Sequence, residues 1–385
     1  VIKDGSSLYG TKGANGVIKI TTTRASELST KIDFTMYGSI NQTPDELPLL
    51  GAYAYRTHLS QLEASRGLSQ SQIAALPYMN DEVGSVGYYK YHNNTNWQEQ
   101  VFKPSVNQNY FLKVRGGDEI AKFGLSVGYL DSKGIVDKTD TKRYSTRLNA
   151  ALKLTEKLSV DANLSFINNI QNQWNQGFAY KTSPIYLALT KSPFLSTKVI
   201  NDAGEVSPNL DDVDYFNVSN PNAILENGFG RNNNYRFFGN LKFKYQLNKS
   251  WNINTILGMT LNKERESFFI PDNGVADIVL PTAIGTNSSG SEIQQYNSLY
   301  TDTYANYFKN FNNDHNLEPT FGVRTQSNKS ESDLGLAYNS STDDFTSVGA
   351  GSNLLRTVGG VLGEWNWFNI YANADYNYRN KYFLT

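Results

Sequence analysis

The sequence predicts an all-β protein whose strands form part of an antiparallel transmembrane β-barrel. Long stretches alternate between apolar and polar residues, which is the pattern of strands with two different faces. Most of these stretches run 11 to 15 residues, about twice the ~5–6 residues of an ordinary globular strand. The connections alternate between short turns and long loops, as they do in barrels of the outer membrane.

The composition excludes several other classes of protein. The 385 residues carry 35 Lys and Arg against 36 Asp and Glu, so no basic excess indicates a nucleic-acid partner. The lack of cysteine excludes disulfide scaffolds, thiolate metal sites and cysteine nucleophiles. No apolar run reaches the ~18–20 residues of a membrane-spanning helix. An aromatic content of 13% is too high for a disordered chain.

The first strand is predicted at 31–41, where Ile32 and Phe34 share one face and Asp33 and Thr35 share the other. Because successive side chains of a strand point to opposite faces, we expect one lipid-facing side and one polar side facing an enclosed lumen. The lipid-facing side should include Phe243, Leu257 and Ile370. Further strands are predicted at 108–118, 121–133, 143–155, 157–169, 234–247, 251–266, 297–311, 315–327 and 364–378, with an eleventh beginning at 381.

The connections between these strands fall into two groups. One rim should carry the short turns, at 118–121, 155–157, 248–250, 312–314 and 379–381. The opposite rim should carry one medium loop and the long extracellular loops, at 134–142 and at about 42–107, 170–233, 267–296 and 328–363. A soluble β-sandwich has no reason to sort its loops in this way, so the asymmetry favours an outer-membrane barrel.

Both ends of the chain suggest a piece of a longer protein. Val1 is not an initiator methionine, and Thr385 follows an apolar run that reads as the start of a strand. Ten or eleven strands would leave two open edges in lipid, where each unpaired backbone group costs several kcal/mol. We therefore expect the remaining barrel strands to follow Thr385.

Three stretches resemble a known family. Residues 1–22 read VIKDGSSLYGTKGANGVIKITT, residues 96–144 run from Asn-Trp-Gln-Glu to Arg-Tyr, and the residues around 378–385 read YNYRNKYFLT. Together they resemble TonB-dependent outer-membrane transporters, and more narrowly the SusC/RagA-type branch of Bacteroidota. The first stretch is similar to the end of the plug domain of that family. Its motif residues here are Lys3, Asp4, Tyr9, Gly10, Gly13, Asn15 and Gly16.

The resemblance implies an architecture and a set of partners. It implies a barrel of about 22 strands with an internal plug. Residues 1–25 would be the C-terminal end of the plug, and 26–385 would be the first half of the barrel, with roughly ten or eleven strands. It also implies a SusD-like surface lipoprotein, TonB acting through a segment upstream of Val1, and a dimer of transporter–lipoprotein pairs. The location would be the outer membrane.

A phosphate-binding loop is the rival interpretation of the first motif. Gly10, Gly13 and Gly16 are spaced G-x-x-G-x-x-G, whereas phosphate loops follow a strand and use other spacings. Here the strand Val17–Thr21 comes after the glycines. The glycines instead allow tight turns and close packing of the backbone against a wall.

The sequence offers no catalytic constellation, so we expect no enzyme. His58, His92 and His315 do not share a metal-ligand spacing, and no nucleophile elbow is present. The one candidate for a cofactor is calcium, because oxygen-rich loops can bind it. The candidate ligands are Asp211, Asp212 and Asp214, although a solvated loop is the alternative.

A large neutral nutrient needs aromatic faces and amide or hydroxyl partners, since sugar rings stack on aromatic side chains through their apolar faces. The loops and the adjacent strand supply such residues, and we expect substrate contacts from Trp97, Trp174, Asn175, Tyr180, Tyr186, Arg231 and Tyr235. Arg231 and Tyr235 are expected to face the lumen near the rim that carries the long loops. In the alternative interpretation, the loop aromatics pack the loops together and contact the lipoprotein lid.

The function that follows is TonB-dependent import of a large nutrient, with an oligosaccharide as the expected cargo. A peptide is the main alternative within the same family. A passive or secretion-related outer-membrane barrel is a further alternative, and a secreted glycan-binding β domain is another. Solubility without detergent would favour the last of these.

Overall fold

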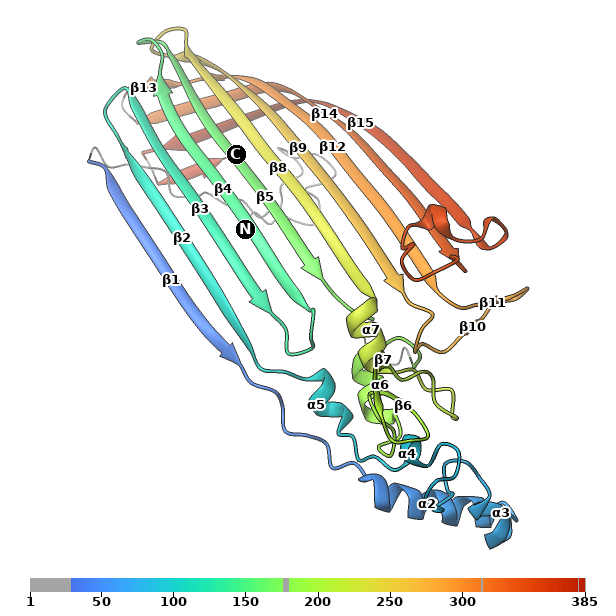
Figure 1. The fold of residues 1–385 in the computed structure, drawn as a ribbon. Coiled ribbons are helices and arrows are strands. Elements are labelled where there is room, and N and C mark those ends of the chain that lie inside the picture. Colours follow the sequence, from blue (N-terminus) through green and yellow to red (C-terminus); the bar gives the residue numbers. More distant parts are fainter. Residues whose placement is uncertain (1–28, 176–179, 313, 380, 385) are drawn as a thin grey trace.

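The structure is a computed structural model that describes residues 29–175, 180–312, 314–379 and 381–384. Its main feature is a curved antiparallel sheet of 12 strands, which form a single layer (Figure 1). Neighbouring strands in the sheet are neighbours in the chain, in the order β1-β2-β3-β4-β5-β8-β9-β12-β14-β15-β16, with β13 paired to β14. This up-and-down order is that of a barrel wall, and it confirms the predicted fold class.

The strands of the wall match the predicted positions most closely at the ends that adjoin the short turns. Lys31–Asn41 agrees residue for residue with the predicted first strand. The wall consists of β1 (Lys31–Asn41), β2 (Ser105–Gly117), β3 (Ala121–Lys133), β4 (Asp140–Lys153), β5 (Leu158–Asn172), β8 (Phe229–Gln246), β9 (Trp251–Ile270), β12 (Ser288–Tyr307), β13 (Lys309–Phe311), β14 (His315–Tyr338), β15 (Thr357–Tyr378) and β16 (Tyr382–Leu384).

The remaining elements lie in the long connections. Six α-helices are found among the described residues, α2 (Ala52–Ser65), α3 (Gln70–Ala74), α4 (Tyr88–Tyr91), α5 (Trp97–Val101), α6 (Pro184–Thr190) and α7 (Pro221–Asn227). Two short β-hairpins and two 3-10 turns accompany them, β6 (Lys198–Ile200) with β7 (Val206–Leu210), β10 (Ile278–Val279) with β11 (Ile284–Gly285), η2 (Val348–Ala350) and η3 (Asn353–Leu355). Within the described part of the chain, none of these helices is long and apolar enough to cross a membrane.

Two long loops are shorter than the sequence predicts. β12 begins at Ser288 rather than 297, and β14 continues to Tyr338 rather than 327. Residues 288–296 are polar and read as loop, yet Ser288 pairs with Ile270 on one side and with Tyr338 on the other. Polar side chains carry no penalty where strands extend beyond the lipid, so backbone pairing alone continues the strands there.

The two faces of the wall differ in chemistry. Leu257, Phe368 and Ile370 lie on one face and are 44%, 65% and 71% exposed. Asp302 and Asn328 lie on the other face and are 3% and 1% exposed, although the described residues form no second layer over them. Side chains converge on the concave face of a curved sheet and diverge on the convex face. The polar face is therefore the concave one, and the apolar convex face is the one that suits lipid.

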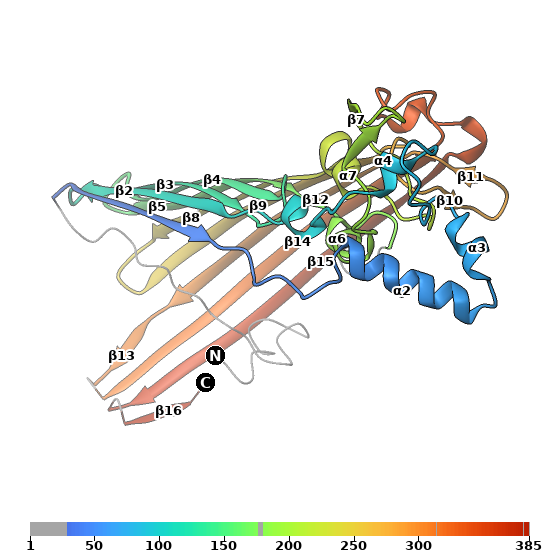
Figure 2. The ribbon, with the colours of Figure 1, turned by 60° about the horizontal axis from the view of Figure 1, so that its bottom comes forward.

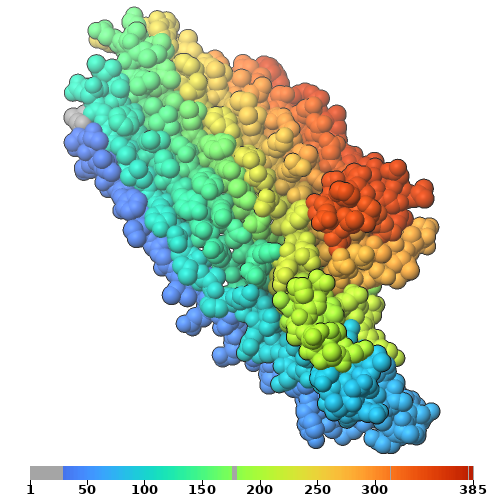
Figure 3. Space-filling model, viewed as in Figure 1, coloured from blue at the N-terminus to red at the C-terminus, as the bar shows by residue number. Residues whose placement is uncertain are grey.

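The apolar core of the described residues lies in the loops and not in the wall. Trp97, Trp174, Phe194 and Ile224 are buried together with helix residues from several connections. Figure 2 shows these helices gathered at one end of the strands, and Figure 3 shows them projecting beyond the wall. We call residues 42–104, 134–139, 173–175, 180–228 and 271–287 the loop domain.

Candidate functional site: the concave wall and the loop domain

The concave wall carries a continuous row of aligned residues across ten strands. Strand pairing places them side by side because each residue is the register partner of the next. The row consists of Lys31, Arg115, Gly124, Asn149, Asn163, Asn240, Gly258, Tyr300, Gln326 and Trp367. Three amides stand next to one another between the two glycines, with Tyr300 beyond Gly258 and Arg115 beyond Gly124. The middle of the row is a surface for neutral polar groups.

A buried ion pair fixes the wall beside this row. Arg324 on β14 donates from Nε and Nη2 to Asp302 Oδ2 on β12, at 3.0 and 2.9 Å. Tyr371 on β15 donates its hydroxyl to Asp302 Oδ1 at 2.9 Å, and Tyr300 donates to Oδ2 at 3.1 Å. The Arg324 guanidinium also lies over the Tyr371 ring, 4.7 Å from its centroid. Asp302 thus ties three strands together, and this orients the Tyr300 and Tyr371 rings on the lumen side.

The loop domain is joined from separate connections by direct hydrogen bonds. The Trp97 indole N–H donates to the Ser192 carbonyl at 3.0 Å, which links α5 to the residues after α6. The Trp174 indole N–H donates to the Asp137 carbonyl at 2.9 Å, which links the second long connection to the β3–β4 hairpin. The Asn220 backbone N–H donates to the Gly274 carbonyl at 2.7 Å. These bonds join connections that are far apart in sequence, so the loop domain is a preformed unit.

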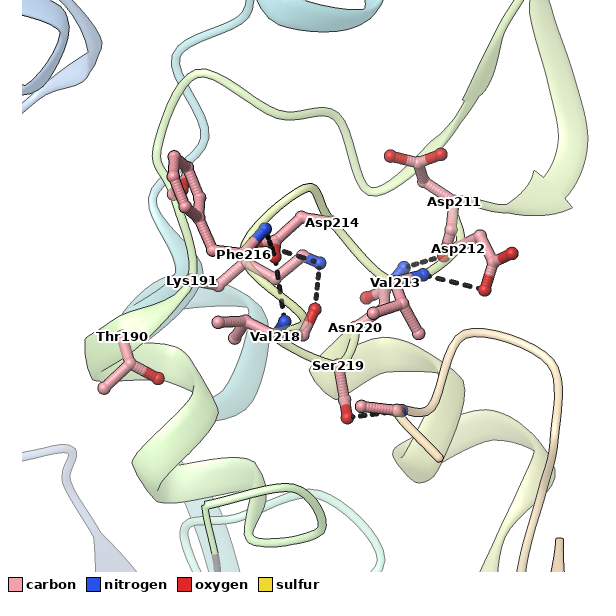
Figure 4. A network of polar contacts seen from close by, with 12 residues as sticks. Thr190, Lys191, Asp211, Asp212, Val213, Asp214, Phe216, Val218, Ser219 and Asn220 are labelled. Atoms are coloured by element: carbon pink, nitrogen blue, oxygen red, sulfur yellow. Dashed lines mark hydrogen bonds and ion pairs between the residues drawn. The ribbon is translucent and has the colours of Figure 1, made fainter. Parts of the chain in front are cut away.

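Two lysine–aspartate pairs sit inside this unit, as Figure 4 shows for the deeper one. Lys191 Nζ donates to the Val218 carbonyl at 2.8 Å and lies 3.7 Å from Asp214 Oδ2. Asp214 Oδ1 accepts the backbone N–H groups of Phe216 and Val218 at 2.9 and 2.8 Å. Burial lowers the pKa of Lys191, and the nearby carboxylates of Asp214 and Asp211 oppose that shift.

The three aspartates proposed for calcium do not converge. Asp211 pairs with Lys90 at 3.3 Å, Asp214 pairs with Lys191, and Asp212 accepts backbone N–H groups from Val213 and Gly274. Across the described ranges, no group of three or more His, Cys, Asp or Glu side chains could hold a metal ion. Asp211, Asp212 and Asp214 are close in sequence, but their side chains do not point to a common position as metal ligands would.

The aromatic residues expected to contact substrate divide into two groups. Trp97 and Trp174 are 3% and 7% exposed and lie in the core of the loop domain, which is the packing role of the alternative interpretation. Tyr180 is 61% exposed, and Asn175 is exposed with its amide donating to Thr182 Oγ1 at 2.8 Å. Tyr186 is half-buried on α6. Tyr180 and Asn175 therefore have surface available for a ligand.

Arg231 and Tyr235 lie on the opposite face from the expected one. Both have the same parity along β8 as Phe237 and Leu241, so strand alternation places them on the convex face. Arg231 donates from Nε to Asn172 Oδ1 at 3.2 Å, outside the lumen. The expectation that they face the lumen is wrong, because β8 is a single uninterrupted strand from Phe229 to Gln246.

The plug motif, from Lys3 to Gly16, lies outside the described residues, as does the whole predicted plug segment 1–25.

The structure also identifies wall residues that the sequence did not single out. These are Phe238, Asp302, Arg324 and Tyr371. Their strand parity marks them as lumen-facing, and that signal could have found them. No local signal identifies Lys191, because its contacts come from Asp214 and Val218 later in its own connection and from Trp97 in another one.

Comparisons with known proteins agree with this architecture. No family model matches the chain. It is 24% identical over its whole length to the TonB-dependent receptor P26 of Formosa agariphila, covering 37% of that receptor. It is also 24% identical over 80% of its length to the TonB-dependent receptor SusC of Bacteroides thetaiotaomicron, covering 30% of it. The chain thus spans about a third of the curated relatives it matches.

Solved structures show the same fold. The chain superposes on the RagAB peptide importer in its closed-closed state with a TM-score of 0.70 and 18% identity, over 97% of this chain and 43% of that one. A second structure of the RagAB peptide transporter gives the same TM-score. In its wall, its loops and its relatives, the chain is similar to part of a TonB-dependent receptor, and its fold is that of an outer-membrane β-barrel wall. More narrowly, the chain is SusC-like.

Proposed function

We propose that the chain forms one half of the wall and part of the mouth of an importer that carries a large neutral nutrient across the outer membrane. The observation that carries this proposal is the two-faced wall. Its convex face is apolar, and its concave face presents Asn149, Asn163 and Asn240 in one row. Amides can exchange hydrogen bonds with a neutral polar solute, and they do not bind one charge tightly. An oligosaccharide is the cargo that fits this lining.

The preformed loop domain supports a partner at the mouth. Its core is dense and internally bonded, yet Tyr53, Val86 and Tyr180 are 86%, 82% and 61% exposed on its surface. Exposed large apolar residues on an ordered unit are typical of an interaction surface. We infer that a SusD-like lipoprotein covers this end, and that TonB supplies the energy from the periplasmic side. The relatives named as TonB-dependent receptors support that inference.

A peptide is the second candidate cargo. The observation in its favour is the fold likeness to the RagAB peptide importer. Peptides also exchange hydrogen bonds with amides, so the row of asparagines fits both classes. Their charged termini distinguish peptides from neutral sugars, and that difference provides the basis of a test.

The test is nutrient uptake in the native host. A strain lacking the gene is compared with the parent, and with a strain lacking TonB function, on single neutral oligosaccharides and on defined peptides. The expected result is a growth defect on one or more oligosaccharides, shared by both mutant strains. A defect confined to peptides would select the second candidate. Growth of both mutants like the parent on every nutrient would refute import by this protein.

A further inference from the structure

The convex face of the wall carries a group of basic residues that has no role in the description above. Arg231 on β8 and Lys263 and Arg265 on β9 are exposed near the ends of these strands that adjoin the long loops. We call these three residues the basic patch. We propose that the basic patch binds the phosphorylated headgroup of a lipid in the outer leaflet of the membrane. This site depends on the wall lying in an outer membrane and is independent of the cargo.

The register of β8 and β9 brings the three residues together. Lys263 is the partner of Tyr235, which lies on the convex face, and Arg265 is two residues further along the same face of β9. The partner of Arg231 is Ser267, two residues beyond Arg265. Diagonal neighbours of this kind are roughly 7–8 Å apart in paired strands, so long side chains can reach the same ligand.

Two aromatic positions on β8 give the depth of the basic patch in the membrane. Tyr235 and Tyr245 are ten residues apart (245 − 235) on the convex face. At ~3.4 Å per residue and a tilt of ~45°, ten residues span about 24 Å, close to the ~25 Å height of the apolar band of a barrel. Lys263 therefore lies at the boundary of the band, and Arg231 and Arg265 lie beyond it, where headgroups are found.

Other tyrosines support this boundary. Tyr235 is in register, through Asn168 on β5, with a tyrosine on each of the three preceding strands. The row consists of Tyr110, Tyr129, Tyr144, Asn168 and Tyr235. Rings with a polar tip favour the interface between lipid and water, so the row marks the outer edge of the apolar band.

The charge of the basic patch is not balanced on its own face. The convex positions are the even-numbered residues of β5 and the odd-numbered residues of β8, β9 and β12, and none of them is Asp or Glu. Basic residues elsewhere on this face have acidic neighbours, since Lys142 is the register partner of Asp131, and Lys329 lies 3.6 Å from Glu331. The basic patch is therefore available to an anion from outside the chain.

The Arg231 guanidinium is oriented and keeps donors for a ligand. Its Nε donates to Asn172 Oδ1 at 3.2 Å, and Asn172 Nδ2 donates to Asp140 Oδ1 on β4 at 2.7 Å. Within the described ranges, the two terminal nitrogens of Arg231 make no hydrogen bond or ion pair. Parallel N–H groups of a guanidinium match the oxygen atoms of a phosphate group.

Basic residues are distributed unequally between the two ends of the convex face. On the ten long strands, every Lys and Arg at a convex position lies in the half that adjoins the loops. These residues are Lys133, Lys142, Arg231, Lys263, Arg265 and Lys329. Contact with water alone would favour basic residues at both ends, and Lys309 on the short β13 is the exception at the turn end. The asymmetry indicates a partner in one leaflet.

The surroundings of the basic patch favour a lipid over a free phosphate ion. Phe237 pairs with Leu261 directly on the membrane side of Tyr235 and Lys263. A lipid whose headgroup contacts the basic patch would lay its acyl chains on these apolar side chains. A free phosphate ion would make the charged contacts only.

The test measures lipid binding to the complete receptor, purified in detergent, by native mass spectrometry. Arg231→Gln together with Arg265→Gln removes two charges of the basic patch. Arg236→Gln together with Lys242→Gln removes two charges from the concave face of β8 and is the matched control. The probes are diphosphoryl lipid A, dephosphorylated lipid A and inorganic phosphate. Folding of every variant is checked by its heat-dependent shift on gels.

We expect diphosphoryl lipid A to bind the unaltered receptor about tenfold more tightly than dephosphorylated lipid A. The patch variant should lose this preference, and the control should stay within about twofold of the unaltered receptor. Equal binding of the two lipids to the unaltered receptor, or equal losses in the patch variant and the control, would overturn the proposal. Displacement of the lipid by millimolar inorganic phosphate would show a site for the free ion, which also overturns it.

A cysteine beside the basic patch gives an independent measurement that leaves its charges in place. The chain contains no cysteine, so Ser267→Cys places one thiol of this chain next to Arg231, and Glu266→Cys places one on the opposite face as the control. Each thiol is coupled to a photoreactive group, and outer membranes of the host are irradiated. We expect position 267 to form at least threefold more adducts with phosphorylated lipid than position 266. Adducts with another protein chain in place of lipid, or equal adducts at both positions, would refute the lipid site.

Discussion

Lys191 and Asp214 form an ion pair that is fully enclosed by the loop domain. Their charged atoms are 3.7 Å apart, and the two side chains are 0% and 1% exposed. Asp214 also accepts two backbone N–H groups of its own turn, and Lys191 donates to a carbonyl of that turn. The pair therefore fixes the turn 214–218 against the end of α6.

Removing one member of this pair should destabilise the loop domain more than removing both. Asp214→Ala leaves the Lys191 ammonium buried, and breaking a buried pair in this way costs about 3–5 kcal/mol. The double change Lys191→Met with Asp214→Asn leaves no unpaired charge and should cost less. Limited proteolysis of the loops, with denaturant, measures the difference. Equal sensitivity of the single and double variants would contradict this expectation.

The same pair predicts a pH dependence of opposite sign to that of a lysine whose pKa is raised by an exposed salt bridge. Burial lowers the pKa of Lys191 from 10.5, so the folded state binds this proton less tightly than the unfolded state. Between the folded-state pKa and 10.5, unfolding therefore takes up a proton, and the group adds stability as the pH rises. We therefore expect the denaturant concentration that unfolds the loops to increase with pH in this range. Lys191→Met should remove it, and an unchanged slope in that variant would refute the assignment.

Trp174→Ala tests whether the loop core acts as a unit. The indole is 7% exposed and donates to the Asp137 carbonyl, so truncation removes packing and one hydrogen bond. We expect a loss of about 3–5 kcal/mol in the stability of the loop domain, with the barrel still folded. Protease sensitivity reports the loops, and the heat-dependent gel shift reports the barrel. Loss of both together would show that wall and loops unfold as one.

Leu257 and Ile256 are adjacent residues on opposite faces of β9 and form a matched pair. Leu257→Lys places a charge on the convex face, where it costs about 2–4 kcal/mol near the middle of a bilayer. Ile256→Lys places the same charge in the lumen, where water is available. Folding yield into lipid vesicles should fall for Leu257→Lys and remain near normal for Ile256→Lys. The reverse order would invert the two faces of the wall.

The sequence predicted the wall well because strand alternation is a local signal. Lys31–Asn41 and Ala121–Lys133 were predicted without error, since each alternates cleanly between apolar and polar residues. The extension of β12 back to Ser288 was not predictable in this way, because backbone pairing with two neighbours creates it. Phe243, Leu257 and Ile370 are on the convex face as predicted.

The candidate site was less accessible to sequence reasoning. Tryptophan is a residue type that is typical of binding sites, but the exposure of Trp97 and Trp174 depends on which connections pack over them. Arg231 and Tyr235 were predicted to face the lumen because they are close to a rim, whereas the alternation of side chains along β8 places them on the convex face. Phe238 was detectable, since it is the apolar exception on a polar face. The roles of all these residues in substrate binding remain predictions.

The location of the apolar core also has an evolutionary consequence. Trp97, Trp174 and Phe194 make their contacts inside the loop domain, and wall strands contribute little to that core. Mutations that reshape the outer surface can therefore accumulate without altering the lipid-embedded strands. A family built on this plan can acquire new specificities by exchanging whole extracellular modules between related barrels, and chimeric receptors made at the strand ends should assemble.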